Sequence, residues 1–273
     1  MRRYLQFDSA GRPVNKTKFK FKKNMSILRE MAKKNFKSQY RNSLLGVLWT
    51  VLHPLLNMAV LALVFSQIFG NRGVGCYPVY LLCGTLIFNT MRQISSQSLS
   101  SVVSQSGLVK KVNVSYSIFP ISTAITGLIN LALSFIALII VMLVLRQTFY
   151  WTMLLTITII PALILFSLGI GFALACLFVF FRDVKHLYEI FLTLWTYLTP
   201  MFYSLDILKP GFISKVINLN PMTHFVTMFR NMIQNGAVPC IQEYLICYGW
   251  GILLFIIGYS LFKLNQRKYI LYI

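Results

Sequence analysis

Apolar residues recur along this chain in long runs, without the strict alternation that marks a half-buried strand. The clearest run covers residues 131–141, where Ser134 is the only polar residue. A helix needs about 20 predominantly apolar residues to cross the hydrocarbon core of a membrane. The pattern therefore predicts an all-α integral membrane protein with about six transmembrane helices. We place these spans at about 47–69, 77–98, 119–145, 152–181, 187–203 and 243–262.

A moderately apolar stretch separates the last two predicted spans. Pro210, Pro221 and Pro239 interrupt it too often for another span. We expect short re-entrant or extracytoplasmic helices there, ahead of the final span.

The segment before the first span has two predicted parts, and residues 46–273 then form the transmembrane domain. Residues 1–25 are rich in lysine and read as a basic arm. Residues 26–45 read as an amphipathic helix at the cytoplasmic interface, with Ser26 as its N-cap. Its apolar face consists of Leu28, Met31, Phe36, Tyr40 and Leu44. The spacing alone leaves two roles open, which are anchoring in lipid and docking to a cytoplasmic partner.

Composition supports the membrane assignment. Of the 273 residues 57% are hydrophobic and 12% are charged, and the mean hydropathy is +0.68. Soluble domains are about 25% charged. A six-span topology with the N-terminus inside puts 21 of the 26 lysines and arginines on the cytoplasmic side. This asymmetry predicts a multi-pass protein of the cytoplasmic membrane with both termini in the cytoplasm. It also accounts for the net charge of +20 without nucleic acid as a partner.

The five cysteines show no CxxC pair and no histidine at metal-ligand spacing, so we expect no metal site. Cys76 and Cys240 both fall in loops predicted to lie outside. A disulfide between them is conceivable, although two free thiols are the expected state.

Catalytic patterns are missing from the sequence. It contains no paired carboxylates, no HExxH motif and no serine nucleophile elbow, and its spans carry no series of acidic residues that would suggest a proton-driven carrier. The phosphate-binding motif G-x-x-x-x-G-K-[ST] is also missing, so the sequence predicts no ATP site and no cofactor of its own. If transport is active, ATP and Mg²⁺ must be bound by another polypeptide.

Four stretches carry a more specific signal. They are Tyr40–Trp49 with Pro54-Leu55, Leu108–Asn113 with Ile118–Ser122, Phe181–Leu187 continuing through Trp195 to Leu198–Tyr203, and Leu219–Met222 with Phe229-Arg230. In this order they resemble the ABC-2 type permeases that export O-antigen, capsule and teichoic acid precursors. The chain departs from that family after Lys111, where Val114–Ser117 replaces a run of an aromatic residue, proline, arginine and glutamate.

The resemblance implies a permease subunit that translocates lipid-linked cell-envelope polysaccharide and is not itself an enzyme. It implies a homodimer of this chain, embedded in membrane lipid, with two separate ATP-hydrolysing subunits beneath it. In such permeases the interface helix and the second quoted stretch contact those subunits. The coupling residues it assigns are Leu108, Val109, Lys110, Lys111, Val112 and Asn113. Arg182 and Asp183 are a further candidate contact. The simpler explanation is positive charge that flanks a span on the cytoplasmic side, with Asp183 paired to Arg182.

A path for glycans needs groups that tolerate many sugars. Aromatic faces stack on sugar rings, so Phe88, Trp195, Tyr197, Phe202 and Tyr203 are candidate lining residues. Arg92 lies about 15 residues into its span. It either extends to the cytoplasmic interface or points into a water-filled cavity, where it could meet a pyrophosphate.

Three alternatives stay open at this level. An ABC-2 permease for drugs or small lipids would share the topology. A membrane-embedded glycosyl or prenyl transferase would need an acidic metal-binding motif. A structural membrane anchor would use only the basic arm.

Overall fold

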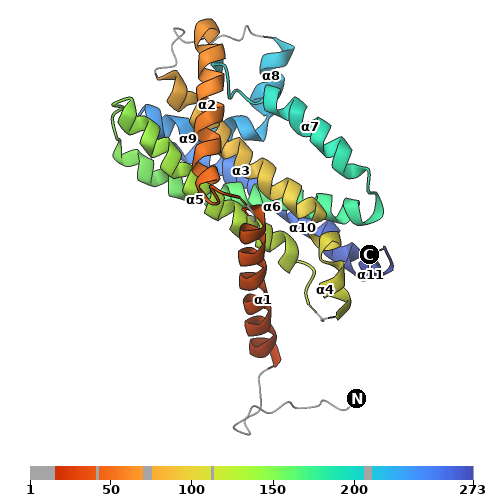
Figure 1. The fold of residues 1–273 in the computed structure, drawn as a ribbon. Helices are drawn as coiled ribbons and strands as arrows, with labels where there is room; N and C mark the ends of the chain where they lie inside the picture. Colours follow the sequence, from red (N-terminus) through yellow and green to blue (C-terminus); the bar gives the residue numbers. More distant parts are fainter. Residues whose placement is uncertain (1–15, 41–42, 70–75, 112–113, 206–210, 273) are drawn as a thin grey trace, which may run out of the picture.

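The computed structural model describes residues 16–40, 43–69, 76–111, 114–205 and 211–272. Within these ranges the regular elements are all helices and no strand occurs, as expected for an all-α protein. Four long helices run side by side and form the body of the molecule (Figure 1). These are α3 (Tyr77–Ser104), α5 (Ile118–Val144), α6 (Thr156–Phe180) and α10 (Ile241–Asn265).

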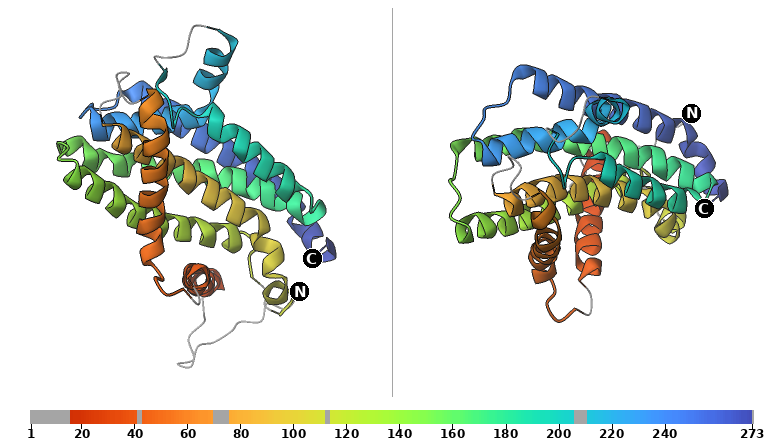
Figure 2. Two further views of the ribbon diagram at one scale, coloured as in Figure 1. Left: turned by 45° about the horizontal axis from the view of Figure 1, so that its top comes forward. Right: turned by 90° about the horizontal axis from the view of Figure 1, so that it is seen from above.

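Two further helices lie on one side of this body. Seen from above, α1 (Lys16–Gln39) and α2 (Leu48–Phe69) project from the side opposite α10 (Figure 2). α2 packs on α3 and α5, and α1 packs on α5. The short helix α4 (Ser106–Lys111) follows α3, and η3 (Gln266–Lys268) with α11 (Tyr269–Tyr272) follows α10.

Three helical segments are long and apolar enough to cross a membrane. They are Ile118–Val144, Trp151–Phe180, which includes the 3-10 turn η1 (Trp151–Leu155), and Ile241–Lys268, with mean hydropathies of 2.7, 2.7 and 2.0. They coincide with the third, fourth and sixth predicted spans. The apolar part of α2 is the shorter segment Leu48–Val64, and α3 has 28 residues but ends in serines and glutamines. The count of six spans therefore stays a prediction.

The helix of the fifth predicted span is shorter than expected and shifted. α7 (Val184–Leu198) has 15 residues, whereas the prediction ran from Leu187 to Tyr203. It ends before Pro200 because a residue that precedes proline avoids the helical conformation, and Thr199 is extended. At about 1.5 Å per residue α7 is only about 22 Å long. Two short helices, α8 (Phe212–Leu219) and α9 (Pro221–Gln234), follow it as expected before α10.

The boundary predicted at Ser26 is wrong. α1 already begins at Lys16 and ends at Gln39, so part of the expected basic arm is helical. Lysine is a good helix former, and this propensity favours a helix even where no apolar face is present. Residues 1–15 of the arm lie outside the described residues.

The backbones of α6 and α10 approach each other closely. A Cβ atom at Gly258 would lie 1.9 Å from the carbonyl oxygen of Gly169, and one at Gly251 would lie 2.8 Å from that of Ala162. On each helix, the two contact points are seven residues apart. Small residues at such positions let membrane helices approach closely, so that dispersion contacts hold the helices together.

Candidate functional site

A row of polar side chains follows one face of α3. Its members recur every three or four residues, which is the spacing of one helix face. They are Asn89, Gln93, Gln97, Ser100 and Ser104. All five line cavities between α3 and the helices α1, α2 and α5.

The larger of these cavities, which we call the polar cleft, has a volume of about 610 Å³. The end of α1, the first half of α2, the middle of α3 and α5 enclose it. Its walls carry amides, hydroxyls, one histidine and one arginine, and no acidic residue is among the described residues that line it. They are Gln39, Tyr40, Trp49, Thr50, His53, Pro54, Asn57, Asn89, Arg92, Gln93, Asn130 and Ser134.

Neutral hydrogen bonds hold α1 over this region. Tyr40 shares a short hydroxyl contact with Thr50, and Asn130 Nδ2 donates to Gln39 Oε1 at 3.0 Å. A second cavity of about 260 Å³ continues between α1, α3 and α5, and Gln39 lines both cavities. There Asn35 Nδ2 donates to Ser122 Oγ at 3.1 Å. The two cavities therefore form one polar surface along α3.

Arg92 belongs to this surface. Its side chain lines the polar cleft together with His53 and Asn57 of α2. The Nδ2 atom of Asn57 lies 3.2 Å from Nδ1 of His53. Which of the two placements expected for Arg92 holds in a membrane stays a prediction. Arg92 is the one basic residue of α3.

The predicted aromatic lining is not brought together at this cleft. Phe88 is only 1% exposed and packs edge-on against Trp195, with ring centroids 6.3 Å apart. It is a core residue here because its helix face meets α6 and α7. Trp195 is half-buried and donates Nε1 to Asn220 Oδ1 at 2.8 Å. Tyr197 is exposed, and Tyr203 donates its hydroxyl to the Tyr197 carbonyl at 2.9 Å.

The segment after α7 carries an arrangement that the sequence analysis missed. Each residue from 198 to 203 has an acceptor bound by a side chain of α3, of α9 or of Asn220, the residue that precedes α9. Asn220 Nδ2 donates to the Leu198 carbonyl and the Thr199 hydroxyl, and the hydroxyls of Tyr77 and Tyr80 donate to the carbonyls of Phe202 and Tyr203. Asn220 also caps α9, with its Oδ1 accepting from the amide of Met222.

Arg230 completes this arrangement, which we call the carbonyl clasp. It is 7% exposed, and its guanidinium donates to the carbonyls of Pro200, Met201 and Tyr80 at 3.1, 3.4 and 3.2 Å. No described carboxylate pairs with it, so carbonyl oxygens and the Tyr80 ring, 3.3 Å from Cζ, stabilise the charge. A cation in a stretch of apolar residues was the signal available in the sequence.

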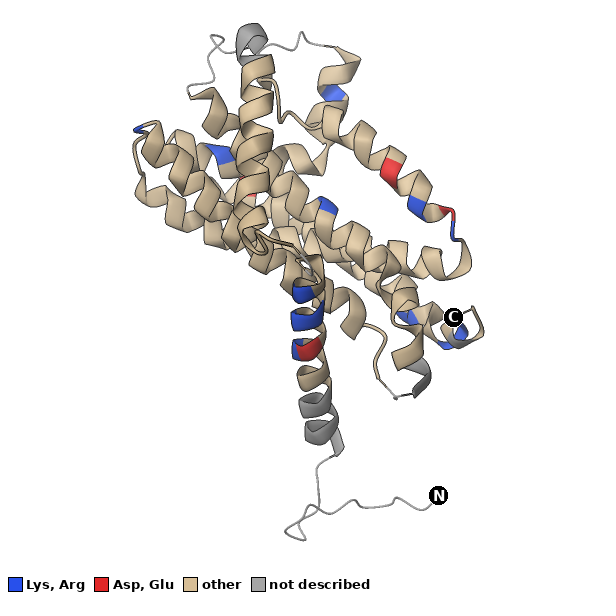
Figure 3. Ribbon diagram, in the orientation of Figure 1, with Lys and Arg blue, Asp and Glu red and all other residues tan. Residues whose placement is uncertain are grey.

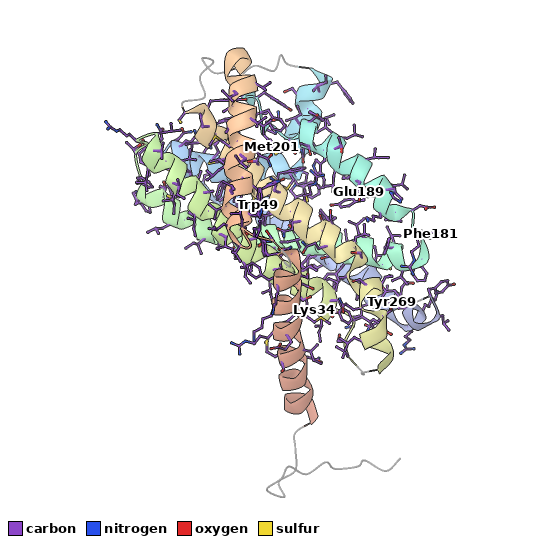
Figure 4. All side chains as sticks on the ribbon, in the orientation of Figure 1. Lys34, Trp49, Phe181, Glu189, Met201 and Tyr269 are labelled. Atoms are coloured by element: carbon purple, nitrogen blue, oxygen red, sulfur yellow. The ribbon has the colours of Figure 1, made fainter. Side chains whose placement is uncertain are left out.

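One coupling candidate, Leu108, and one interface candidate, Met31, share an apolar cluster at the opposite end of the molecule. Figure 4 shows Tyr269 and Phe181 at this end, away from Met201 of the clasp. Leu108 of α4 and Tyr116 pack in one apolar cluster with Met31 of α1 and the buried Tyr269. The rings of Tyr116 and Tyr269 lie 5.6 Å apart.

The remaining coupling and interface candidates are placed as follows. Arg182 donates to the Tyr272 carbonyl at 3.2 Å, and the ion pair expected between Arg182 and Asp183 is not formed. Whether these residues contact a partner or only flank a span with positive charge stays a prediction. Leu28 is half-buried on α1, and Phe36 packs against Tyr40 with ring centroids 5.2 Å apart. Val109, Lys110 and Lys111 end α4, and Val112 and Asn113 lie outside the described residues.

All five cysteines are free thiols. Cys83, Cys176 and Cys247 are buried, and Cys240 is exposed in the turn before α10. The conceivable disulfide between Cys76 and Cys240 is therefore not formed.

Comparison with known proteins decides the family. The profile described as ABC-2 type transporter matches residues 27–233, from the middle of α1 to the end of α9. The chain belongs to the ABC-2 type transporter family. This confirms the resemblance expected from the four quoted stretches. Family membership and the long apolar helices together identify the chain as a multi-pass membrane protein.

Individual ABC-2 relatives match along nearly their whole length. The O-antigen export system permease protein RfbA of Myxococcus xanthus is 25% identical over 244 residues, which are 89% of this chain and 94% of the relative. A protein of the same name from Klebsiella pneumoniae is 26% identical over 256 residues, which are 92% and 96%. α10 lies beyond the ABC-2 profile.

Proposed function

We propose that this chain is the permease subunit of an ATP-driven exporter of lipid-linked cell-envelope polysaccharide. The observation that carries the proposal is the match, over at least 94% of their length, to relatives named as O-antigen export permeases. Family membership favours a transport subunit over a membrane-embedded transferase.

The polar surface along α3 supports this function. Its amides and hydroxyls can exchange hydrogen bonds with sugar hydroxyls without requiring one sugar sequence. Arg92, Trp195, Tyr197, Phe202 and Tyr203 remain the proposed path residues. Phe88 supports Trp195 from the core and is available to a path only if the helices rearrange.

The same surface favours a homodimer. Exposed polar groups in the middle of a long helix, such as Asn89 and Arg92, are costly against hydrocarbon. A second copy of the chain, enclosing a water-filled path, would give them a polar environment. Two ATPase subunits, which bind ATP and Mg²⁺, would then contact the end formed by α1, α4 and the α6–α7 turn.

The distribution of charge supports an orientation with this end in the cytoplasm of a cytoplasmic membrane. Basic residues concentrate on α1 and around the C-terminal helices (Figure 3). The opposite end carries few of them, among them Arg146 and Lys215.

Reconstitution of the purified chain with its cognate ATPase subunit tests the function. The chain alone should hydrolyse no ATP, the mixture should hydrolyse it, and cells that lack the chain should accumulate lipid-linked glycan on the cytoplasmic side. ATP turnover by the chain alone, or normal glycan export in such cells, would contradict the proposal. Export of a drug or small lipid in place of glycan would favour the alternative ABC-2 function.

A further inference from the structure

The C-terminal segment, residues 266–272, carries one fully buried ring. It consists of η3 and α11, which continue from the end of α10. Leu271 and Tyr272 are 80% and 55% exposed, whereas Tyr269 is 0% exposed. The Tyr269 hydroxyl donates to the Phe262 carbonyl at 2.9 Å, so its polar atom is paired with α10. A buried ring beside exposed neighbours indicates that Tyr269 is a main attachment point of this segment.

Tyr269 contacts rings from three different parts of the chain. Its ring centroid lies 5.6 Å from that of Tyr116, which follows α4, and 6.1 Å from that of Phe180 at the end of α6. The Phe262 ring of α10 lies 5.2 Å away. All three pairs meet edge to face, and this geometry adds attraction beyond the burial of apolar area. Tyr269 therefore links the residues after α4 to the end of α6.

Tyr272 attaches the same segment to the turn between α6 and α7. Its ring centroid lies 5.1 Å from that of Phe180, and its carbonyl accepts a hydrogen bond from Arg182 at 3.2 Å. The Arg182 guanidinium also lies over the Phe178 ring, 5.1 Å from its centroid. The segment therefore contacts two turns at one end of the molecule (Figure 1). They are the α4 turn, which is α4 with residues 114–117, and the α6–α7 turn, residues 181–183.

These two turns belong to the end of the molecule that the proposed function assigns to the ATPase subunits. Leu108 of α4 and Met31 of α1 belong to the same apolar cluster as Tyr269. A protein interior is packed as densely as an organic crystal, so the displacement of one member moves its neighbours. Displacement of the α4 turn would thus pass through Tyr269 to α6 and α10. The family profile ends at residue 233 and does not include this segment.

We propose that the C-terminal segment makes the α4 turn and the α6–α7 turn move as one unit, with Tyr269 as the positioning residue between them. The inference rests on the proposed function, because an ATPase subunit supplies the displacement. A purely structural role is the alternative. In that case the segment stabilises the fold and the two turns move independently.

The first test measures the distance between the two turns in the purified chain alone. Spin labels are attached to cysteines introduced at Gly107, where a Cβ atom would meet nothing within 4 Å, and at the exposed His186. Cys76 and Cys240 are replaced by serine, and labelled chain is diluted with unlabelled chain so that only distances within one chain are measured.

The variants separate the ring of Tyr269 from its hydroxyl. Tyr269→Ala should broaden the distribution of distances, because the ring contacts to both turns are lost. Tyr269→Phe keeps the ring and should keep the wild-type distribution. Leu271→Ala is the matched control and should also keep it, because Leu271 is an exposed residue of the same segment.

The second test measures export per ATP hydrolysed after reconstitution with the cognate ATPase subunit. This ratio does not depend on the amount of folded protein, so a purely structural role would lower Tm and leave the ratio unchanged. Tyr269→Ala should lower the ratio roughly 2- to 30-fold, the range for residues that couple distant sites, and Tyr269→Phe should retain it. Tyr116→Ala removes the other ring of the contact and should act alike, which keeps the test decisive if Tyr269→Ala does not fold.

The two tests also separate this inference from the proposed function. An unchanged distance distribution or an unchanged ratio in a folded Tyr269→Ala or Tyr116→Ala variant would overturn the positioning role. A wild-type complex without ATP-dependent export would instead contradict the proposed function, and the distance measurement would then decide the link between the turns by itself.

Discussion

The contact between α6 and α10 allows a sharp test of the packing. Replacing Gly258 with alanine would place a Cβ atom 1.9 Å from the carbonyl oxygen of Gly169, where real contacts are essentially never under 3.0 Å. The obstacle is backbone and not a flexible side chain, so the two helices would have to separate by about an ångström or more. Overpacking of this kind costs about 1–3 kcal/mol and occasionally more, and we expect about 3 kcal/mol here.

Gly249 provides the matched control. It lies in the same helix, and a Cβ atom there would meet nothing within 4 Å. Gly249→Ala should be neutral or stabilise the chain by up to about 1 kcal/mol, since alanine favours helix more than glycine does. Gly251→Ala, with a contact of 2.8 Å to Ala162, should have an intermediate effect.

The buried thiols of Cys83, Cys176 and Cys247 provide the assay. A dye that reacts with thiols reports unfolding in detergent as these cysteines become exposed, with Cys76 and Cys240 replaced by serine in every variant. A loss of 1 kcal/mol lowers Tm by roughly 2–4 °C in domains of comparable size. Gly258→Ala should thus lower Tm by roughly 6–12 °C. An unchanged Tm, or an equal fall in Gly249→Ala, would refute the close approach of α6 and α10.

Three further predictions concern the clasp, coupling and orientation. Arg230→Met should leave the carbonyls of Pro200 and Met201 without the donor they have in the wild type, at about 1–3 kcal/mol each, and a Tm equal to that of Lys215→Gln, which removes an exposed cation on α8, would contradict this. Leu108→Asp should insert normally but lose ATPase stimulation and export, because it puts a carboxylate in an apolar cluster. The double variant Lys110→Ala with Lys111→Ala should keep most of both activities. Intact export in Leu108→Asp would exclude this turn from coupling. In intact cells with Cys76 replaced by serine, a membrane-impermeant thiol reagent should label the exposed Cys240 and not a cysteine introduced at Lys185, and the reverse labelling would invert the orientation.

The sequence by itself determined the class of protein and much of its helix pattern. A helix that crosses hydrocarbon needs a continuous run of apolar residues, so the apolar runs alone place α5, α6 and α10 within a few residues. Proline effects are local as well, and Pro200 could have placed the end of α7 at Leu198. The family could also be recognised, because its motifs are runs of neighbouring residues.

Only the tertiary structure decided which side chains meet. Arg230 follows Tyr80 by 150 residues, and Asn130 follows Gln39 by 91, so no local pattern predicts either contact. Phe88 and Arg92 lie one helical turn apart on the same side of α3, yet Phe88 is buried and Arg92 lines a cleft, because different elements pack around α3 at the two positions. The periodicity of a helix gives the residues that share a face, and the neighbouring helices determine whether that face becomes core, lipid contact or a binding site.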